Sequence, residues 1–201
     1  MVTIVDLTKP ADDACLSPQE AKRALSFSTA ILRQRFVGSH VALRQTLAEH
    51  LNEDPREIRF GYSKTGKPIH PKINFSLSHS ADFALIGTNK SRLIGIDLEI
   101  VRPVENALQI AKRFFATCEY DYLNACSKAE LLTEFFKIWT AKEALIKAKG
   151  IKLVENLQKE VVCHPGVTNG GYWIMPYTHP LLVGYIAHVA VQNDLGGLNP
   201  T

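Results

Sequence analysis

Apolar residues recur along this chain at two different spacings, which separate the expected helices from the expected strands. Apolar positions three and four residues apart are typical of a helix with one buried face. Such stretches lie at residues 33–51, 107–115, 119–126 and 130–149. Ser17 followed by Pro18 predicts a further helix start, and Gly150 is placed where the last of these helices should end.

Short runs rich in β-branched and aromatic residues, bounded by turn residues, indicate strands. These runs are residues 2–7, 58–60, 74–78, 84–88, 93–99, 171–175 and 182–191. We expect the three runs between 74 and 99 to form one small antiparallel sheet. Helices followed by strands occur twice along the chain. This order predicts an α+β fold of two pseudo-symmetric halves, residues 1–101 and 102–201, each a small antiparallel sheet with packed helices.

Composition narrows the class of protein. The chain has 201 residues, of which 46% are hydrophobic and 21% charged, as in ordinary globular proteins. Its net charge of +3 is too small to indicate a nucleic-acid binder, and we expect no nucleic acid. Neither a signal peptide nor a membrane span is recognisable. The four cysteines show no CxxC spacing, which favours reduced thiols in a cytoplasmic protein. They are Cys15, Cys118, Cys126 and Cys163.

Asp97 and Glu99 lie two residues apart in an expected strand. Side chains at i and i+2 of a strand point to the same face, so these carboxylates are neighbours. Adjacent like charges repel each other unless a positive group lies between them. The pair is therefore either the solvated acidic face of a strand or part of a site for a hard cation such as Mg²⁺, which prefers oxygen ligands.

The longest expected helix carries two charged residues where its apolar stripe predicts burial. The stripe passes from Trp139 into Glu143 and Lys147. These charges are four residues apart and can form an ordinary helical ion pair. Alternatively, Glu143 completes a cation site with Asp97 and Glu99, and Lys147 points toward an anion that the metal holds. Three carboxylates beside one ammonium favour the second interpretation.

Ser78 ends the expected strand at 74–78, and His79 follows it directly. Adjacent strand residues point to opposite faces, so they are poorly placed to act together as nucleophile and base. Ligand binding by one or both is one interpretation, and a capped strand end with a solvated histidine is the other. The seven histidines include no HExxH and no paired Cys/His spacing, which argues against a zinc site.

Residues 61–67 match the GxxxxGK part of a nucleotide-binding P-loop. Pro68 stands where Ser or Thr is needed and cannot continue into a helix, so we exclude a nucleoside triphosphatase. The turn still leaves Lys67 available to a phosphate. Basic residues near the N-terminus form either a solvated surface or a phosphate-binding patch. They are Lys22, Arg23, Arg33, Arg35 and Arg44.

Five segments, in order, resemble the motifs of phosphopantetheinyl transferases. The sequences 95–99 (GIDLE) and 136–150 (FKIWTAKEALIKAKG) look like the two signature motifs of that family. The sequences 66–68 (GKP) and 74–80 (NFSLSHS) resemble two more, and residues 16–44 resemble its arginine-bearing N-terminal region. The similarity covers roughly residues 16–160. The chain is about twice as long as the trimeric holo-acyl-carrier-protein synthase type. It therefore looks like the surfactin-synthetase-activating type, a monomer of two pseudo-symmetric halves.

The resemblance implies a role for each matching residue. Asp97, Glu99 and Glu143 would hold Mg²⁺, with Asp97 and Glu143 taking part in catalysis. Lys147 would stabilise or protonate the leaving 3′,5′-ADP. Contacts to the phosphates and adenosine of coenzyme A would come from Lys67, Ser78, His79, Lys147, Arg23 and Arg35.

The activity implied is transfer of 4′-phosphopantetheine from coenzyme A to a serine of an acyl or peptidyl carrier protein, in the cytoplasm. Two alternatives stay open at this point. A non-catalytic nucleotide- or partner-binding module could use the same charged groups, but it gives no reason for Glu143 on an apolar stripe. A Mg²⁺-dependent hydrolase of coenzyme A would release 3′,5′-ADP without any carrier.

Overall fold

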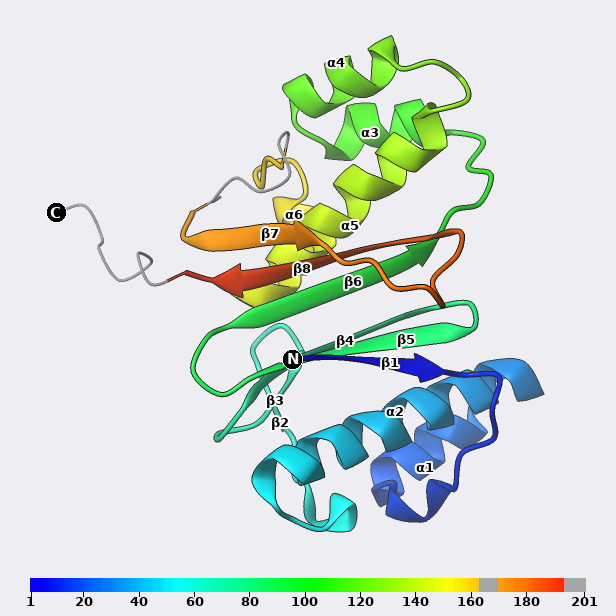
Figure 1. Ribbon diagram of the computed structural model, residues 1–201, viewed down its shortest axis with the longest axis vertical. Coiled ribbons are helices and arrows are strands. Elements are labelled where there is room, and N and C mark those ends of the chain that lie inside the picture. The colour runs from blue at the N-terminus through cyan, green and yellow to red at the C-terminus, as the bar shows by residue number, and fades with distance from the viewer. Residues whose placement is uncertain (163–169, 194–201) are drawn as a thin grey trace, which may run out of the picture.

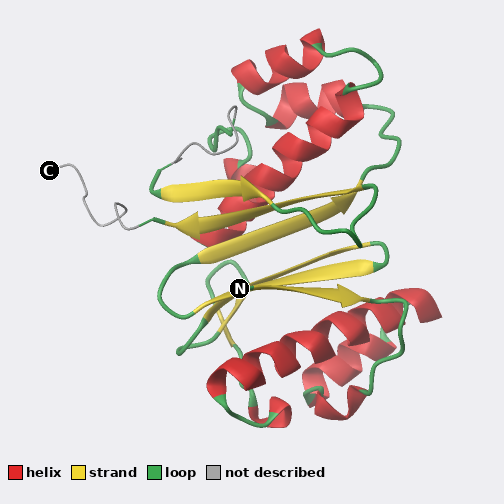
Figure 2. Ribbon diagram, in the orientation of Figure 1, coloured by secondary structure: helices red, strands yellow, loops and turns green. Residues whose placement is uncertain are grey.

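The computed structural model describes residues 1–162 and 170–193; Cys163 lies outside these ranges. It contains two three-stranded sheets with helices packed outside them (Figures 1 and 2). The strands are β1 (Val2–Asp6), β2 (Gly61–Tyr62), β3 (Pro68–Ile69), β4 (Asn74–Ser80), β5 (Phe83–Asn89), β6 (Ile94–Ile100), β7 (Tyr172–Pro176) and β8 (Tyr185–Gln192). The helices are α1 (Pro18–Leu25), α2 (Ala30–Leu51), α3 (Ala107–Phe114), α4 (Thr117–Ala125), α5 (Leu131–Lys149) and α6 (Leu153–Asn156), with short 3₁₀ turns η1 (Asp13–Cys15) and η2 (Pro55–Glu57).

The two sheets have matching designs. In the first, the strand order is β1-β5-β4, and in the second it is β6-β8-β7, with antiparallel pairing throughout. Helices α1 and α2 lie beside the first sheet, and α3, α4 and α5 lie beyond the second (Figure 1). The small β2–β3 hairpin stands apart from both sheets. The predicted α+β class is confirmed.

Two expectations about the strands are wrong. Residues 58–60 form no strand: the buried Ile58 follows the 3₁₀ turn η2, and pairing begins only at β2. The three strands between 74 and 100 also do not form one antiparallel sheet, because β6 pairs with β8. The boundary between the two sheets lies in the turn between β5 and β6, because β5 belongs to the first sheet and β6 to the second. This boundary comes earlier in the chain than the expected division near residue 101. The domain division itself stays a prediction.

Three apolar clusters hold these layers together. One lies between α2 and the first sheet and includes Leu47 and Ile86. A second lies between the sheets, where Leu85 meets Ile96. The third packs α5 against the second sheet and the helices α3 and α4. Within the described residues, none of the helices combines the length and the apolar character that crossing a membrane requires.

Local sequence signals explain where the site-bearing helices begin and end. Ser17 and Glu20 form a capping box at the start of α1, with Pro18 in its first turn, as predicted. Gly150 ends α5 in the left-handed conformation with φ 66°, which costs glycine little because it has no Cβ. The end of α5 lies next to the turn of the β2–β3 hairpin.

Gly95 brings α5 directly onto β6. A Cβ built at this glycine would lie 2.0 Å from the Ala144 carbonyl oxygen and 2.3 Å from the Ala148 nitrogen. Only a residue without a side chain permits so close a contact. Asp97 and Glu99 lie on the same face of β6 as Gly95, since strand side chains alternate. They therefore face the helix that carries Glu143 and Lys147.

Candidate active site

The Lys147 ammonium links the carboxylates of β6 and α5. Its Nζ lies 2.6 Å from Asp97 Oδ1 and 3.4 Å from the nearer oxygen of Glu143, one turn earlier in α5. It also lies 3.2 Å from the Ser78 hydroxyl of β4. Glu99 extends the acidic face of β6 and accepts a hydrogen bond of 2.8 Å from Ser80. One ammonium is thus shared by acidic groups that lie far apart in the sequence.

Burial and mutual repulsion shift the pKa values of these groups. Burial, then the neighbouring charge of Asp97, raises the pKa of Glu143 to about 7. Burial and Asp97 likewise raise the pKa of Glu99, against the lowering effect of its Ser80 hydrogen bond. Burial would lower the pKa of Lys147, but the carboxylates of Asp97 and Glu143 outweigh it and raise that pKa. Near neutral pH, Lys147 is therefore charged and Glu143 can exchange a proton.

The chemistry of the cluster suits a hard cation. All side-chain ligands on offer are carboxylate oxygens, which Mg²⁺ prefers. Asp97 is 2% exposed, and its Oδ2 is buried without a hydrogen-bond partner, which is costly for an ionised oxygen. However, within residues 1–162 and 170–193, no three His, Cys, Asp or Glu side chains already form a ligand group for a metal. The ligand atoms of this cluster therefore suit Mg²⁺, but the carboxylates are not yet arranged around a single metal position.

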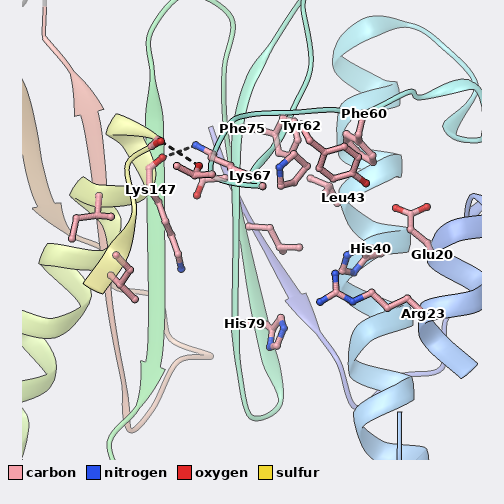
Figure 3. A pocket seen from close by; sticks show the side chains of 18 of the residues that line it. Glu20, Arg23, His40, Leu43, Phe60, Tyr62, Lys67, Phe75, His79 and Lys147 are labelled. Atoms are coloured by element: carbon pink, nitrogen blue, oxygen red, sulfur yellow. Dashed lines mark hydrogen bonds between the residues drawn. The ribbon is translucent and has the colours of Figure 1, made fainter. Parts of the chain in front are cut away.

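A cavity of about 640 Å³ opens beside Lys147 (Figure 3). Its walls come from α1, α2, β4, the β2–β3 turn and the end of α5, so the first sheet and helices of both halves of the chain contribute to it. One part of the wall is aromatic and apolar, with Phe36, Phe60 and Phe75. Another part is basic or polar. The cavity therefore combines flat apolar surface with several positive groups, as a nucleotide-like ligand requires.

Four of the six residues expected to contact coenzyme A line this cavity: Arg23, Lys67, His79 and Lys147. In Figure 3, Arg23 and His79 extend from different walls toward the same space. The pKa of Lys67 falls to about 8 because of burial and the nearby charge of Lys147. Burial, Lys147 and Arg35 also lower the pKa of His79. His79 is therefore mostly neutral at pH 7, and the lysines and Arg23 supply the positive charge.

The other two expected residues lie outside the lining, and Arg44 from the expected basic patch has a structural role. Ser78 is buried between the sheets, where it donates to Asp97 Oδ1 at 2.8 Å. Arg35 pairs with Asp82 at 2.7 Å. Arg44, expected in the basic patch, is 2% exposed and bonds Glu20 and the carbonyls of Pro55 and Ile58. Buried guanidinium groups of this kind hold a fold together and are not free for phosphate.

Sequence reasoning missed His40 and the aromatic wall. The His40 ring stacks on Phe36 with centroids 3.9 Å apart, and the Arg23 guanidinium lies 5.4 Å from the same Phe36 ring. Burial lowers the pKa of His40, so it faces the cavity as a neutral imidazole. The aromatic residues of α2 looked like ordinary core positions, and no local signal separates a core ring from a cavity wall.

The β2–β3 turn closes the cavity by holding the end of α5. Lys67 donates a 2.6 Å hydrogen bond to the Lys147 carbonyl, and Thr65 donates one of 3.3 Å to the Gly150 carbonyl. Cationic groups are favourable at helix C-termini, where carbonyl groups are unpaired. The segment that resembled a P-loop thus forms a turn that binds the end of α5 beside the cavity.

Comparison with known proteins agrees with this arrangement. A sequence model of the 4′-phosphopantetheinyl transferase superfamily matches residues 93–174, the stretch that contains β6 and α5. The chain is 37% identical over 158 residues to the 4′-phosphopantetheinyl transferase HetI of Nostoc sp., covering 76% of this chain and 67% of that protein. It is 33% identical over 138 residues to the 4′-phosphopantetheinyl transferase Sfp of Bacillus subtilis, covering 67% of this chain and 60% of that protein.

A third relative is the putative 4′-phosphopantetheinyl transferase slr0495 of Synechocystis sp., 36% identical over 146 residues. That match covers 70% of this chain and 59% of the relative, so the chain spans about three-fifths of the length of slr0495 and Sfp. On these grounds, the chain belongs to the 4′-phosphopantetheinyl transferase superfamily, whose members use coenzyme A as the donor.

Proposed function

We propose that this chain transfers the 4′-phosphopantetheine group of coenzyme A to a serine hydroxyl of an acyl or peptidyl carrier protein. The products are the holo-carrier and 3′,5′-ADP. The observation that carries the proposal is the position of Lys147, which bonds Asp97, neighbours Glu143 and lines the cavity. A non-catalytic binding module has no need for acidic groups with raised pKa values at the edge of a cavity that contains several basic residues.

The cavity is the proposed site for coenzyme A. Arg23, Lys67 and Lys147 supply positive charge for its phosphates, and His79 supplies a hydrogen bond. The aromatic wall around Phe36 offers a flat surface for the adenine. This placement leaves the pyrophosphate next to Asp97 and Glu143, because Lys147 contacts both carboxylates and lines the cavity.

Asp97, Glu99 and Glu143 are the proposed ligands of Mg²⁺, because they combine an oxygen-only donor set with the unpaired Asp97 Oδ2. The bound cation would neutralise negative charge on the pyrophosphate and so favour attack on it. Lys147, held charged by its acidic neighbours, would lie close to the leaving phosphate.

In the proposed reaction, the carrier serine oxygen forms a bond to the phosphorus that bears pantetheine. The bond from that phosphorus to the bridging oxygen breaks, and 3′,5′-ADP leaves with the electron pair. Glu143 is the proposed acceptor of the serine proton, because its carboxylate lies beside Lys147 at the edge of the cavity. Lys147 stabilises the charge that develops on the leaving phosphate.

The proposed enzyme acts as a monomer in the cytoplasm. One chain already supplies every wall of the cavity, so a second copy is not needed to complete it. Cys15 and Cys126 are free thiols, which is consistent with a reducing compartment.

Intact-mass measurement of an apo-carrier protein incubated with the enzyme, coenzyme A and Mg²⁺ tests this function. The expected result is a mass gain of one phosphopantetheine group on the carrier, together with release of 3′,5′-ADP. Release of 3′,5′-ADP without a carrier would instead indicate a hydrolase. No gain on a panel of fatty-acid, polyketide and peptide-synthetase carriers would contradict the proposal.

A further inference from the structure

The two sheets meet along β4 and β6 without a backbone ladder. These strands are neighbours across the boundary but belong to separate hydrogen-bonded sheets. Three serines of β4 take over the role of the missing carbonyl acceptors. The backbone nitrogens of Ile96, Leu98 and Ile100 donate to the hydroxyls of Ser76, Ser78 and Ser80, at 3.1, 3.3 and 3.1 Å. We call Ser76, Ser78 and Ser80 the serine ladder.

The serine ladder fixes the direction of its own hydroxyl protons. A backbone N–H can only donate, so each serine oxygen accepts from β6, and its single proton is left for another acceptor. Ser78 gives its proton to Asp97 Oδ1 at 2.8 Å, and Ser80 gives its proton to Glu99 Oε2 at 2.8 Å. The Ser78 hydroxyl therefore links the Leu98 nitrogen to the Asp97 carboxylate. In the same way, the Ser80 hydroxyl links the Ile100 nitrogen to the Glu99 carboxylate.

The first serine of the ladder lacks this second contact. Ser76 accepts from Ile96, and the residue before Ile96 is Gly95, which has no side chain to receive a proton. The ladder thus contains one member without a carboxylate partner and two that also orient carboxylates. Ser76 is a natural internal control for the other two.

Ser80 matters more for orientation than Ser78. Asp97 is nearly inaccessible and is also held by Lys147 at 2.6 Å, so it keeps a partner if Ser78 is lost. Glu99 is longer, only half-buried, and held at its carboxylate by Ser80. A glutamate without such a contact can occupy several rotamers, and choosing one of them on binding costs free energy.

We propose that Ser80 is a positioning residue that aims the Glu99 carboxylate at the cation shared with Asp97 and Glu143. This inference rests on the proposed function for the presence of the cation. Hydrogen bonds to metal-ligating carboxylates orient the ligand, and their loss weakens metal binding even though the ligand itself is intact. The role is confined to orientation, and Ser80 does not contact the reacting groups.

Mn²⁺ binding to the purified protein, followed by the magnetic resonance signal of free Mn²⁺, separates orientation from general damage. Ser80→Ala should weaken Mn²⁺ binding by about tenfold or more. Ser76→Ala removes an equivalent backbone contact and should leave Mn²⁺ binding close to wild type. Ser80→Thr keeps a hydroxyl and should also bind like wild type. If Ser80→Ala does not fold, Ser80→Val against Ser80→Thr makes the same comparison between a methyl and a hydroxyl.

Equal Mn²⁺ affinity in Ser80→Ala and wild type would overturn the inference. So would an equal loss in Ser76→Ala and Ser80→Ala, which would indicate damage to the junction between the sheets. The carrier assay with Mg²⁺ distinguishes these failures from failure of the proposed function. A wild-type protein that modifies a carrier while Ser80→Ala retains full Mn²⁺ affinity contradicts only the positioning role, whereas a wild-type protein that modifies no carrier contradicts the proposed function.

Discussion

The backbone at Gly95 lies against the Ala144 carbonyl of α5, with no room for even a methyl group between them. This contact sets the distance between β6 and α5. It therefore determines whether Lys147 can reach Asp97 on one side and Glu143 on the other. Gly95 is thus required for the close packing that brings Asp97 of the first motif to Glu143 and Lys147 of the second.

Replacing Gly95 by alanine should destabilise the protein severely. The new Cβ would overlap backbone atoms of α5, which cannot move aside as a side chain can. We expect a loss in the free energy of unfolding of about 3 kcal/mol, at the upper end for overpacked sites. Gly61→Ala is the control, because its Cβ would meet only Ile69, at ordinary contact distances of 3.4 Å to its side chain and 4.0 Å to its carbonyl oxygen. Urea unfolding of both variants tests this, and an unchanged midpoint for Gly95→Ala would refute it.

Lys142 lies beside Glu143 in the signature motif, but we expect it to stabilise the fold and not to take part in the reaction. Its ammonium is fully buried with Glu119 at 2.7 Å and also donates to the carbonyls of Leu157 and Glu160. Lys142→Met strands the Glu119 carboxylate and should cost about 3–5 kcal/mol of unfolding free energy.

Two comparisons make the Lys142 prediction specific. Adding Glu119→Gln to Lys142→Met should recover part of the loss, because the stranded group is then neutral and can still accept from the Val162 nitrogen. Lys137→Met breaks only an exposed pair with Glu134 and should cost less than about 1 kcal/mol. If chemical denaturation shows that Lys137→Met and Lys142→Met lose the same unfolding free energy, this account of the buried pair is wrong.

Arg23 and Arg35 should differ in their effect on coenzyme A. Arg23 lines the cavity, whereas Arg35 is paired with Asp82 outside it. Arg23→Ala should weaken coenzyme A binding by roughly tenfold or more, as expected for a lost bond to a charged group. Arg35→Ala should bind nearly as wild type. Titration calorimetry decides between them, and the reverse order would show that the cavity is not the phosphate site.

Binding of 3′,5′-ADP should weaken as pH rises through the pKa of Lys67. This pKa is about 8 in the free protein, so the ammonium is present at neutral pH and is lost at higher pH. His40 and His79 have lowered pKa values and are already neutral, and Lys147 has a raised pKa and stays charged. Between about pH 7.5 and about pH 9.5, the decrease in affinity should thus follow Lys67.

Lys67→Arg provides the comparison for this pH dependence. Arginine keeps its charge over the whole range, so the affinity of the variant for 3′,5′-ADP should change little with pH. If the dissociation constant for 3′,5′-ADP rises with pH equally steeply in wild type and Lys67→Arg, then a group other than Lys67 causes the pH dependence.

Local signals in the sequence were enough to place most elements and the key charged residues. The capping box at Ser17 and the terminal glycine of α5 depend only on neighbouring residues, so they could be predicted. The strand that carries Asp97 and Glu99 was also recognisable from its own composition. The structure brings Glu143 and Lys147 to that strand, as the pattern of charges on an apolar stripe suggested.

Non-local pairing was the part that the sequence could not specify. β6 was expected beside β5, yet it pairs with β8, about 90 residues later in the chain. Arg44 looked like part of a basic surface, but the carbonyls that bury it belong to residues after α2. The role of Ser78 depends on β6 lying alongside β4, which no local pattern encodes.

The rate of phosphopantetheine transfer to an apo-carrier, with and without Asp97, tests the central claim most directly. Wild type should load the carrier in Mg²⁺. Asp97→Ala should reduce the rate by about 100-fold or more while the thermal unfolding midpoint is kept, because it removes a group that organises charge at the reaction centre. Full transfer by Asp97→Ala in Mg²⁺ would contradict the assignment of this carboxylate cluster as the catalytic site.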